Sequence, residues 1–333
     1  MTIETSLTRL LGLSAPIVQA PIGGLTNPRL AAAVSNAGGL GMLAIGFRTV
    51  EDIRENLRAT KALTSRPFGV NLIIDEPQEE RLAVALEDGG VKLVSFFWGD
   101  PARYLPAVHA AGALASLTTG SAAEAKQAVD DGVDIIVAQG WEAGGHVWGE
   151  VSTLALVPAV VDGVGSGVPV IAAGGITDGR GLAAALALGA GGGWMGTRFV
   201  AAEETGAHPD YLARLLVARE TDTFHSSLFD IGWPDAPHRT LRNATIEAWL
   251  AAGRPPSGQR PGEGDILAHR ADGSEIVRYQ SISVRDSVSG NVADLSLWAG
   301  QGAGLVHDVL PAGEIVRRVT AQAEAVLAAL AKP

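Results

Sequence analysis

A histidine ends the longest loop that follows a predicted strand. The apolar run VDIIVA leads into QGWEAGGH at residues 139–146, where two glycines place His146 on a flexible backbone. An imidazole titrates near neutrality, so it can hold an anion or move a proton. A single histidine is more often an ordinary surface or core residue, but only His146, of seven, is predicted to follow a strand. Glu142 could orient this imidazole or be an ordinary solvated loop acid.

Glycines follow the last two predicted strands. The run VPVIAA ends at Ala173 and precedes Gly174 and Gly175, and GGGWMG ends at Gly196 and precedes Thr197. Glycine lets backbone N–H groups approach a ligand without a Cβ in the way. In α/β barrels these two loops are the usual phosphate site. The glycines could instead merely close tight turns, but the two loops together, with the Thr197 hydroxyl, favour a phosphate.

Tryptophans gather near the same predicted strand ends. Trp98, Trp141, Trp148 and Trp194 fall at or near them, and Trp233 falls in the segment beyond the last strand. Large apolar side chains around an open face can hold an apolar ligand and exclude water. They can equally pack one part of the chain against another, and the two uses are compatible.

Residues that other chemistries need are missing. The sequence has no Cys, which excludes disulfides, thiolate metal sites and a cysteine nucleophile. It has no P-loop, HExxH or G-x-S-x-G motif, and no lysine at the end of a predicted strand, which argues against a Schiff-base aldolase. GLGMLA at 39–44 leads from a helix into a strand, the wrong order for a dinucleotide site. Glu142 and His146 are spaced like two metal ligands on one face of a helix. Gly144 and Gly145 lie between them and disfavour a helix, so we expect no metal.

Eight repeated units must position these residues. Apolar runs without alternation, typical of strands buried on both faces, begin near Pro16, Leu40, Phe68, Val91, Ala113, Val133, Val168 and Gly191. Helix starts are expected from capping residues at Asn27-Pro28, Thr49, Glu76-Pro77, Asp100-Pro101, Ser121 (with Glu124 as a capping box), Ser152 and Asp178. Eight units indicate an α/β fold of the (β/α)8 barrel type, with a doubly wound open sheet as the alternative. The active site of a barrel lies where its strands end.

The regular alternation stops after Thr197. We expect the barrel to span residues 1–205, a lid or small subdomain to span 206–290, and residues 291–333 to pack back on the barrel. The lid is rich in Pro turns and contains a predicted hairpin, ILAHR and EIVRY around Asp272-Gly273. The last segment, 313–331, has the apolar spacing of an amphipathic helix.

Composition narrows the class of protein. The chain has 42 glycines in 333 residues without a three-residue period, and 47% apolar residues, so it is neither collagen-like nor disordered. A net charge of −11 argues against nucleic acid and anionic membranes as partners. The N-terminus lacks a signal-peptide pattern, and the uncharged run between Arg180 and Arg198 is too weakly apolar to span a membrane. We expect a cytoplasmic protein, either a monomer or a homodimer.

Over nearly its whole length the chain resembles the nitronate monooxygenase family, formerly the 2-nitropropane dioxygenases, which are FMN-dependent barrels. The resemblance rests on PIVQAPIGG (16–24), GVN (69–71), QGWEAGGH (139–146), VPVIAAGGITDGRGLAAALALGA (168–190), MGTRF (195–199) and WAGQGAGLV (298–306). EAGGH and AAGGI at this separation are specific to the flavin superfamily and less specific to one reaction. Flavin-dependent enoyl-acyl-carrier-protein reductases and some NAD(P)H:quinone reductases are similar in the same places.

The resemblance implies FMN as the cofactor and assigns residues to it. Gly174, Gly175, Gly196 and Thr197 would hold the phosphate; Ala20, Pro21, Asn71, Gln139, Gly144 and Gly145 would line the ribityl chain and isoalloxazine. Gln301 and Gly302 would close one side, and Ile22, Gly23, Thr118 and Ala173 complete the expected set. His146 would be the catalytic histidine. The expected substrate pocket comprises Phe97, Trp98, Trp141, Trp148 and Trp233.

The sequence departs from the family at two positions. Many members have a histidine where this chain has Phe97, and Trp148 closely follows the GGH motif, so the pocket is more apolar. The first hypothesis is oxidation of a nitronate or nitroalkane by O2 to a carbonyl compound and nitrite, with His146 as base or anion stabiliser. In the second, NAD(P)H reduces FMN and a quinone or enoyl thioester accepts the electrons. In the third, the barrel binds a phosphate without flavin.

Overall fold

The predicted apolar runs form eight parallel strands in the computed structural model, which describes residues 3–87 and 90–331. The strands are β1 (Ile17–Gln19), β2 (Gly41–Ala44), β3 (Phe68–Ile73), β4 (Val91–Phe97), β5 (Leu114–Thr119), β6 (Ile135–Gln139), β8 (Val170–Ala173) and β9 (Gly192–Met195). Their order is β1-β9-β8-β6-β5-β4-β3-β2. Leu40 N donates to Ile17 O (2.9 Å) and Gln19 N to Leu40 O (3.0 Å), which joins the two edges. The sheet is therefore a barrel, as predicted, and not an open sheet.

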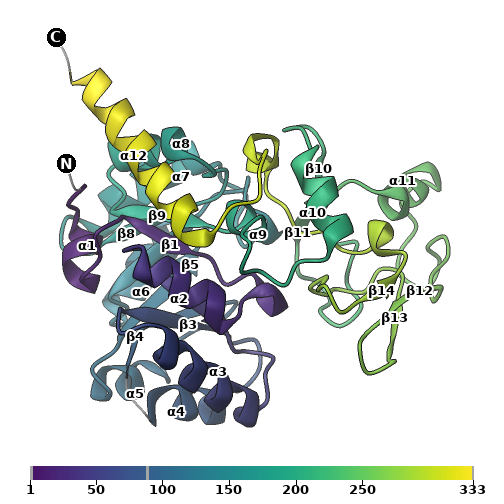
Figure 1. The fold of residues 1–333 in the computed structure, drawn as a ribbon, viewed down its shortest axis with the longest axis horizontal. Coiled ribbons are helices and arrows are strands. Elements are labelled where there is room, and N and C mark those ends of the chain that lie inside the picture. The colour runs from purple at the N-terminus through teal and green to yellow at the C-terminus, as the bar shows by residue number, and fades with distance from the viewer. Residues whose placement is uncertain (1–2, 88–89, 332–333) are drawn as a thin grey trace.

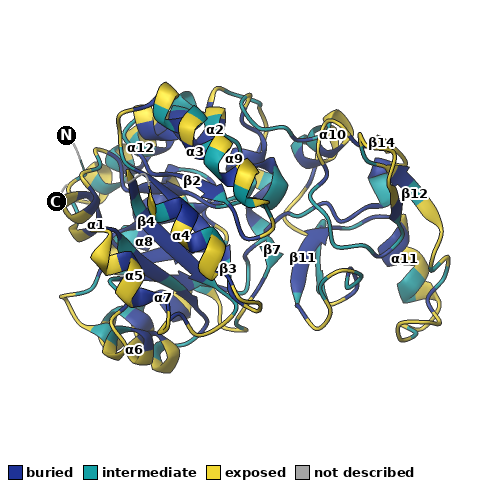
Figure 2. Cartoon of the chain, turned by 90° about the horizontal axis from the view of Figure 1, so that it is seen from below, coloured by how far each residue is buried: buried dark blue, intermediate teal, exposed yellow. Residues whose placement is uncertain are grey.

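Helices surround the barrel and turn their apolar faces inward (Figures 1 and 2). They are α1 (Ser6–Leu11), α2 (Pro28–Asn36), α3 (Val50–Leu63), α4 (Glu79–Glu87), α5 (Leu105–Ala110), α6 (Ala122–Asp130), α7 (Thr153–Val164), α8 (Gly179–Ala187) and the short α9 (Thr197–Val200). In Figure 2 the barrel strands are buried, whereas the outer faces of α3, α4, α5 and α6 carry exposed residues. The fold therefore keeps its largest apolar core between strands and helices.

Most predicted caps form, and the exceptions have local causes. The side chains of Asn27, Thr49 and Ser121 accept first-turn N–H groups. The predicted capping box is incomplete, because the Glu124 carboxylate accepts the N–H of Gly120 (2.8 Å) instead.

Two helices begin later than predicted. Helix α4 starts at Glu79, three residues beyond the weak cap Glu76. Helix α5 starts at Leu105, because the Asp100 side chain binds the N–H of Ala102 (2.9 Å) in a separate turn.

A second, smaller region follows the barrel and lies beside its strand ends (Figure 1). It contains α10 (Pro209–Leu216), β10 (Thr223–Ser226), β11 (His238–Leu241), α11 (Ala244–Ala251), β12 (Ile266–His269), β13 (Glu275–Val277), β14 (Ser289–Gly290), and the 3-10 helices η2 (Val292–Asp294) and η3 (Gln301–Leu305). Strands β12 and β13 form an antiparallel pair around Asp272-Gly273. The apolar core of this region extends past residue 290 to Val306.

The C-terminal helix returns to the barrel. Helix α12 (Ala312–Leu330) packs against α8 and α2. A Cβ on Gly179 would lie 2.4 Å from the backbone nitrogen of Ala323, so this glycine allows α8 and α12 to approach closely. None of the helices in residues 3–87 and 90–331 is both long and apolar enough to cross a bilayer.

Candidate active site

A cavity of about 730 Å³ lies between the C-terminal ends of the barrel strands and the second region. Every barrel strand contributes residues at or just beyond its end, and residues 232–233, 270–288 and 298–302 close the other side. The volume is within the range of roughly 300–1,000 Å³ that is usual for ligand pockets. The position is the one that the strand ends predict.

The expected cofactor-binding residues lie together in this cavity, with one exception. The lining includes Ala20, Pro21, Ile22, Gly23, Asn71, Thr118, Gln139, Gly144, Gly145, Ala173, Gly174, Gly175, Gly196, Thr197 and Gly302. Gln301 is not part of the lining, although its neighbours Gly300 and Gly302 are. The backbone N–H of Gln301 donates to Glu142 O (2.9 Å), which ties the start of η3 to the loop that follows β6.

The glycines of these loops serve two different purposes. A Cβ on Gly144, Gly174 or Gly302 would lie 2.3, 2.8 or 2.0 Å from protein atoms of a neighbouring loop or helix, so these three allow loops to pack. Gly145 (φ 71°) and Gly175 (φ 72°) have the left-handed backbone that favours glycine, with no atom closer than 3.6 Å to a Cβ. Gly145 and Gly175 therefore leave open space beside bare backbone in the cavity wall.

The start of helix α8 is already bonded within the protein. The Asp178 carboxylate accepts the N–H groups of Arg180 (2.9 Å) and Gly181 (3.3 Å), and Gly179 N donates to Gln322 Oε1 (2.8 Å). A phosphate would therefore contact the glycine loops after β8 and β9 more readily than the first turn of this helix.

His146 lies on a short strand that the sequence did not predict. Strand β7 (Gly145–His146) pairs with β11, so the loop after β6 becomes the edge of a sheet in the second region. Gln139 fixes this loop from the end of β6: its Nε2 donates to His146 O (3.1 Å), and its Oε1 accepts Trp148 N (2.8 Å). The histidine is thus anchored to both parts of the molecule.

The imidazole of His146 is enclosed by aromatic rings. Its centroid lies 3.9 Å from that of Trp233, 5.3 Å from Trp298 and 5.8 Å from Trp98. Nδ1 is buried and has no hydrogen-bond partner among the described residues, while Nε2 is 3.5 Å from Ser281 Oγ. An unpaired buried nitrogen beside a cavity is the kind of group that a ligand would satisfy.

Burial and the neighbouring His238 lower the pKa of His146 to about 3. The imidazole is therefore neutral at pH 7. It offers one N–H and one lone pair, so it can accept a proton or donate a hydrogen bond but carries no standing positive charge.

His238 is a structural histidine. Its Nδ1 binds Ala236 O (2.9 Å), its Nε2 accepts Phe229 N (3.2 Å), and burial lowers its pKa to about 4. Because both nitrogens have partners inside the protein, His238 holds the second region in place and is not available to a ligand.

Only two of the five predicted pocket aromatics, Phe97 and Trp233, line the cavity. Trp98 lies one layer behind, with its ring centroid 5.3 Å from that of Trp233, and has an unusual left-handed backbone (φ 65°). Trp148 is 39% exposed and donates from Nε1 to Glu124 Oε2 (3.1 Å). Trp141 packs under the guanidinium of Arg239, 4.3 Å from its ring centroid. Trp98, Trp141 and Trp148 are expected in the substrate pocket, but the structure places them outside the cavity lining, where each packs against other side chains.

Glu142 caps a helix rather than orienting the histidine. Its Oε2 accepts Thr153 N and Thr153 Oγ1, both at 2.9 Å, at the start of α7. The predicted cap, Ser152, makes no such side-chain bond. Glu142 therefore attaches the loop after β6 to the start of α7. It neither orients the imidazole of His146 nor is an ordinary solvated acid.

Several lining residues from the second region were missed. Trp298, Ser281, Ser283, Arg270 and Arg285 all line the cavity. These residues do not follow barrel strands, so the rule that active-site residues lie at strand ends could not find them. The WAGQGAGLV motif, which includes Trp298, was the only feature of the sequence that pointed to this side of the cavity.

Fold and site together define a (β/α)8-barrel enzyme whose ligand cavity is covered by a second region. A model of the family described as Nitronate monooxygenase matches residues 4–87 and 77–322. The chain belongs to the nitronate monooxygenase family, as the motifs predicted, and it is a flavoprotein oxidoreductase.

Relatives within this family carry different names. The chain is 38% identical over 249 residues (74% of this chain, 68% of the relative) to a (3aS,4S,5R,7aS)-5-hydroxy-7a-methyl-1-oxo-octahydro-1H-indene-4-carboxyl-CoA dehydrogenase of Mycobacterium tuberculosis. It is 33% identical to a nitronate monooxygenase of Pseudomonas aeruginosa, covering 93% of this chain and 96% of that protein. The structure of FabK from Thermotoga maritima superimposes with a TM-score of 0.81 at 32% identity, covering 99% of both chains.

Proposed function

We propose that this protein binds FMN in the cavity and oxidises nitronates, or their parent nitroalkanes, with O2 to a carbonyl compound and nitrite. The observation that carries the proposal is the neutral imidazole of His146, which lines the cavity with its Nδ1 unpaired, in the same cavity as the glycine loops after β8 and β9. FMN, when bound, would accept electrons from the substrate and pass them to O2.

The residues present fit this cofactor. The cavity is large, Gly175 and Gly196 contribute backbone without side chains, and the Thr197 hydroxyl accepts Gly300 N (3.0 Å), which leaves its own proton to donate. Asn71, within β3, and Gln139, at the end of β6, also line the cavity; the Asn71 Nδ2 donates to Ser95 O (3.1 Å), and its Oδ1 can accept a bond from the cofactor. We assign the phosphate to Gly174, Gly175, Gly196 and Thr197, and the ring system to the residues nearer His146.

His146 would act from its neutral form. With a neutral nitroalkane, the lone pair takes the proton from the carbon that bears the nitro group. With a nitronate, the ring N–H donates a hydrogen bond to the anion. The rings of Trp233 and Trp298 beside the imidazole, with Phe97 elsewhere in the cavity lining, exclude water and thereby strengthen that contact.

Replacing His146 by Ala tests the proposal. Turnover of a nitronate should fall about 10²–10⁴-fold, because the proton acceptor or donor is lost, while the flavin absorbance of the purified protein persists. His307→Ala is the matched control, since His307 is exposed and outside the cavity lining, and it should leave turnover unchanged. Full nitronate activity in His146→Ala would remove this residue from the mechanism, and a colourless protein after addition of FMN would overturn the cofactor assignment.

A second candidate function keeps FMN and changes the substrates. NAD(P)H would reduce the flavin, and a thioester or quinone would exchange electrons with it. The 38% identical relative named as a carboxyl-CoA dehydrogenase favours a thioester, and so do Arg270 and Arg285 in the cavity lining. Anaerobic mixing separates the two candidates: rapid bleaching of the flavin band by NADH or NADPH supports the second, and bleaching by nitronate alone supports the first.

A further inference from the structure

We propose that the outer part of the cavity is a subsite for the adenosine diphosphate end of a ligand whose other end reaches His146. This subsite, here called the mouth, consists of Phe47, Arg270 and Arg285, which line the cavity, together with Arg48, which lies outside the lining but near enough to Arg285 for their charges to interact. The inference rests on the second candidate function and deepens it, because a nitronate carries no phosphate and needs only the inner end of the cavity.

Arg285 supplies an uncompensated charge at the mouth. Its residue is exposed and lines the cavity, and its methylene chain lies over Gly24, where a Cβ would come within 3.6 Å of Cδ. Within residues 3–87 and 90–331 its guanidinium has no hydrogen bond or ion pair. An exposed guanidinium with all its donors unused is well suited to a phosphate, which it can bind in bidentate geometry.

Arg48 holds a second charge close to the first. Its Nε donates to Ala44 O (2.9 Å) and its Nη2 to Thr26 O (2.8 Å), so backbone carbonyls, not a carboxylate, fix its position. Burial and the nearby charge of Arg285 lower the pKa of Arg48, which shows that the two guanidinium groups repel each other. Asp52 offsets this repulsion only in part. A bound dianion would relieve it.

Arg270 adds a third charge from the β12–β13 hairpin. Its Nη1 donates to Ser274 Oγ (3.3 Å) and Glu275 O (3.1 Å), which are neutral acceptors. The carboxylate of Asp272 also lines the cavity and lies close enough to Arg270 for their charges to interact, but it forms no ion pair with the guanidinium and instead accepts the N–H and hydroxyl of Ser274 (2.9 and 2.7 Å). In contrast, the buried Arg198 and Arg260 each pair with a carboxylate, Asp308 and Asp230 respectively, both at 2.7 Å.

An exposed aromatic ring stands beside these charges. Phe47 is 72% exposed, lines the cavity, and meets the ring of Trp233 edge-on at 5.9 Å. An exposed phenyl face is a surface on which a purine can stack. Stacking surface and phosphate donors at one opening match adenosine diphosphate, which is shared by coenzyme A and by NAD(P)H.

Direct binding to the FMN-loaded full chain tests the proposal. Isothermal titration with ADP should show saturable binding, with adenosine and inorganic pyrophosphate each binding at least tenfold more weakly. Arg285→Ala and Phe47→Ala should each raise the Kd for ADP tenfold or more, and Arg285→Lys should restore part of the affinity. Arg58→Ala is the matched control, because Arg58 is an exposed arginine of α3 outside the cavity lining and its loss changes the net charge equally.

Titrations with coenzyme A and with NADH then identify the source of the diphosphate. Tighter binding of coenzyme A than of ADP assigns the mouth to a thioester, and tighter binding of NADH assigns it to the reductant. The proposal is wrong if ADP does not saturate by about 5 mM, if Arg285→Ala and Phe47→Ala bind ADP as the unaltered protein does, or if neither longer ligand binds as tightly as ADP. Nitronate turnover without nucleotide is measured on the same preparation. A failure to bind ADP can then be told apart from a failure to oxidise nitronates.

Discussion

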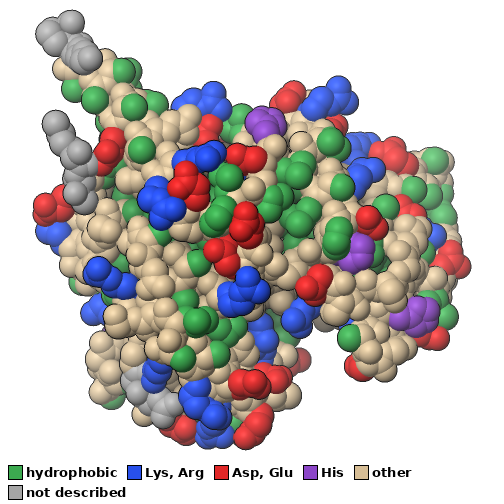
Figure 3. All heavy atoms as spheres, in the orientation of Figure 1, with side chains coloured by type: hydrophobic (Ala, Val, Ile, Leu, Met, Phe, Trp, Pro, Cys, Tyr) green, Lys and Arg blue, Asp and Glu red, His purple; other side chains and the backbone are tan. Residues whose placement is uncertain are grey.

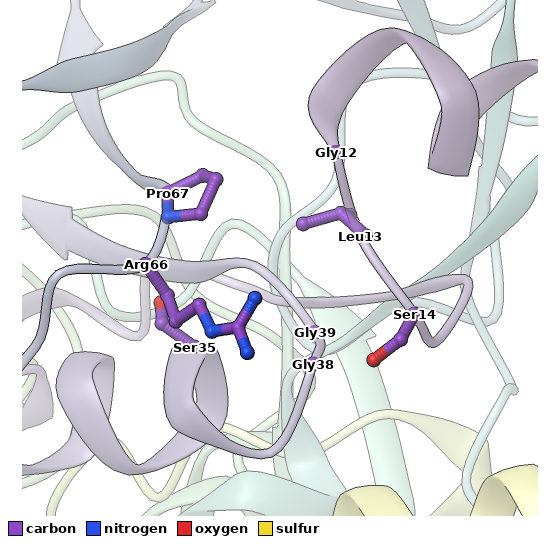
Figure 4. A pocket seen from close by; sticks show the side chains of 8 residues that line it. All are labelled: Gly12, Leu13, Ser14, Ser35, Gly38, Gly39, Arg66 and Pro67. Atoms are coloured by element: carbon purple, nitrogen blue, oxygen red, sulfur yellow. The ribbon is translucent and has the colours of Figure 1, made fainter.

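The two ends of the barrel use the same kinds of residue for opposite purposes. At the N-terminal ends of the strands, a hollow of only about 110 Å³ lies among Gly12, Ser14, Gly38 and Arg66 (Figure 4). Its loops bind each other, since the N–H groups of Ser14 and Ala15 both donate to Gly38 O at 3.0 Å.

At the C-terminal ends, polar groups stay without partners. The cavity there measures about 730 Å³ and contains the unpaired Nδ1 of His146 and the unpaired guanidinium of Arg285. The face seen in Figure 3 shows acidic and basic side chains intermixed. The end of the barrel that binds ligands thus has the larger cavity and an unpaired buried nitrogen in its wall, whereas the loops at the other end bind each other.

Replacing one glycine by alanine at each end of the barrel should give the largest difference in stability and flavin content between the two ends. Gly144→Ala places a methyl 2.3 Å from the backbone nitrogen of Gly300, so the loop after β6 must move. We expect a loss of about 3 kcal/mol in the free energy of unfolding together with loss of bound flavin. Urea denaturation and the visible spectrum measure the two effects.

Gly12→Ala is the control at the opposite end. Nothing lies within 4 Å of a Cβ there, and only the left-handed backbone (φ 70°) opposes the methyl. We expect about 1 kcal/mol of destabilisation and normal flavin content. If Gly144→Ala and Gly12→Ala lost equal amounts of unfolding free energy and flavin, the proposed difference between the two ends of the barrel would be wrong.

The barrel and its strand-end loops could be predicted because their signals are local. Apolar runs specify buried strands, and capping residues such as Asn27 and Ser121 specify where helices begin. Parallel strands that end on one face bring Asn71, Gln139 and Gly174 together whatever the details of packing. The family and the fold followed from these features.

The second region could not be predicted in the same way. The positions of Ser281, Trp298 and Arg285 depend on contacts between distant segments, and no periodic pattern marks them. Trp141 was misplaced because a buried arginine more than ninety residues later, Arg239, covers its ring. The role of Glu142 depends on Thr153, whose backbone N–H becomes a helix terminus only once α7 has formed.

The pH dependence of stability should report the burial of His146. Its pKa is about 3 in the folded protein and near 6.5 in the unfolded chain. As pH falls below 6.5, the unfolded state binds a proton that the folded state does not, so stability present at pH 7 is lost progressively toward pH 3.

Between pH 7 and pH 5 this loss amounts to about 2 kcal/mol. His146→Gln should therefore flatten the profile of unfolding free energy in that interval by about the same amount. His307→Ala is again the control and should keep the slope. A slope unchanged in His146→Gln would mean that the imidazole is solvated and titrates normally.

Glu142→Gln should have a moderate effect that is confined to the loop. The amide keeps one acceptor for Thr153 but loses the charge that favours a helix N-terminus, so we expect about 1 kcal/mol of destabilisation. Since Glu142 has no hydrogen bond to His146, the pH profile of nitronate turnover should keep its shape. A shifted profile would show that the carboxylate acts on the histidine after all.

The smallest effect is expected from an arginine at the far end of the barrel. Arg66 is exposed beside the small hollow, and in the part of the chain that the structure describes its guanidinium has no carboxylate partner, which makes it superficially similar to Arg285. It has neither an exposed aromatic ring nor a second guanidinium in that lining. Arg66→Ala should therefore change the free energy of unfolding by less than about 0.5 kcal/mol and leave the Kd for ADP unchanged. Weakened ADP binding in this variant would show that unpaired arginines attract the nucleotide wherever they lie, and that the mouth owes its affinity to charge alone.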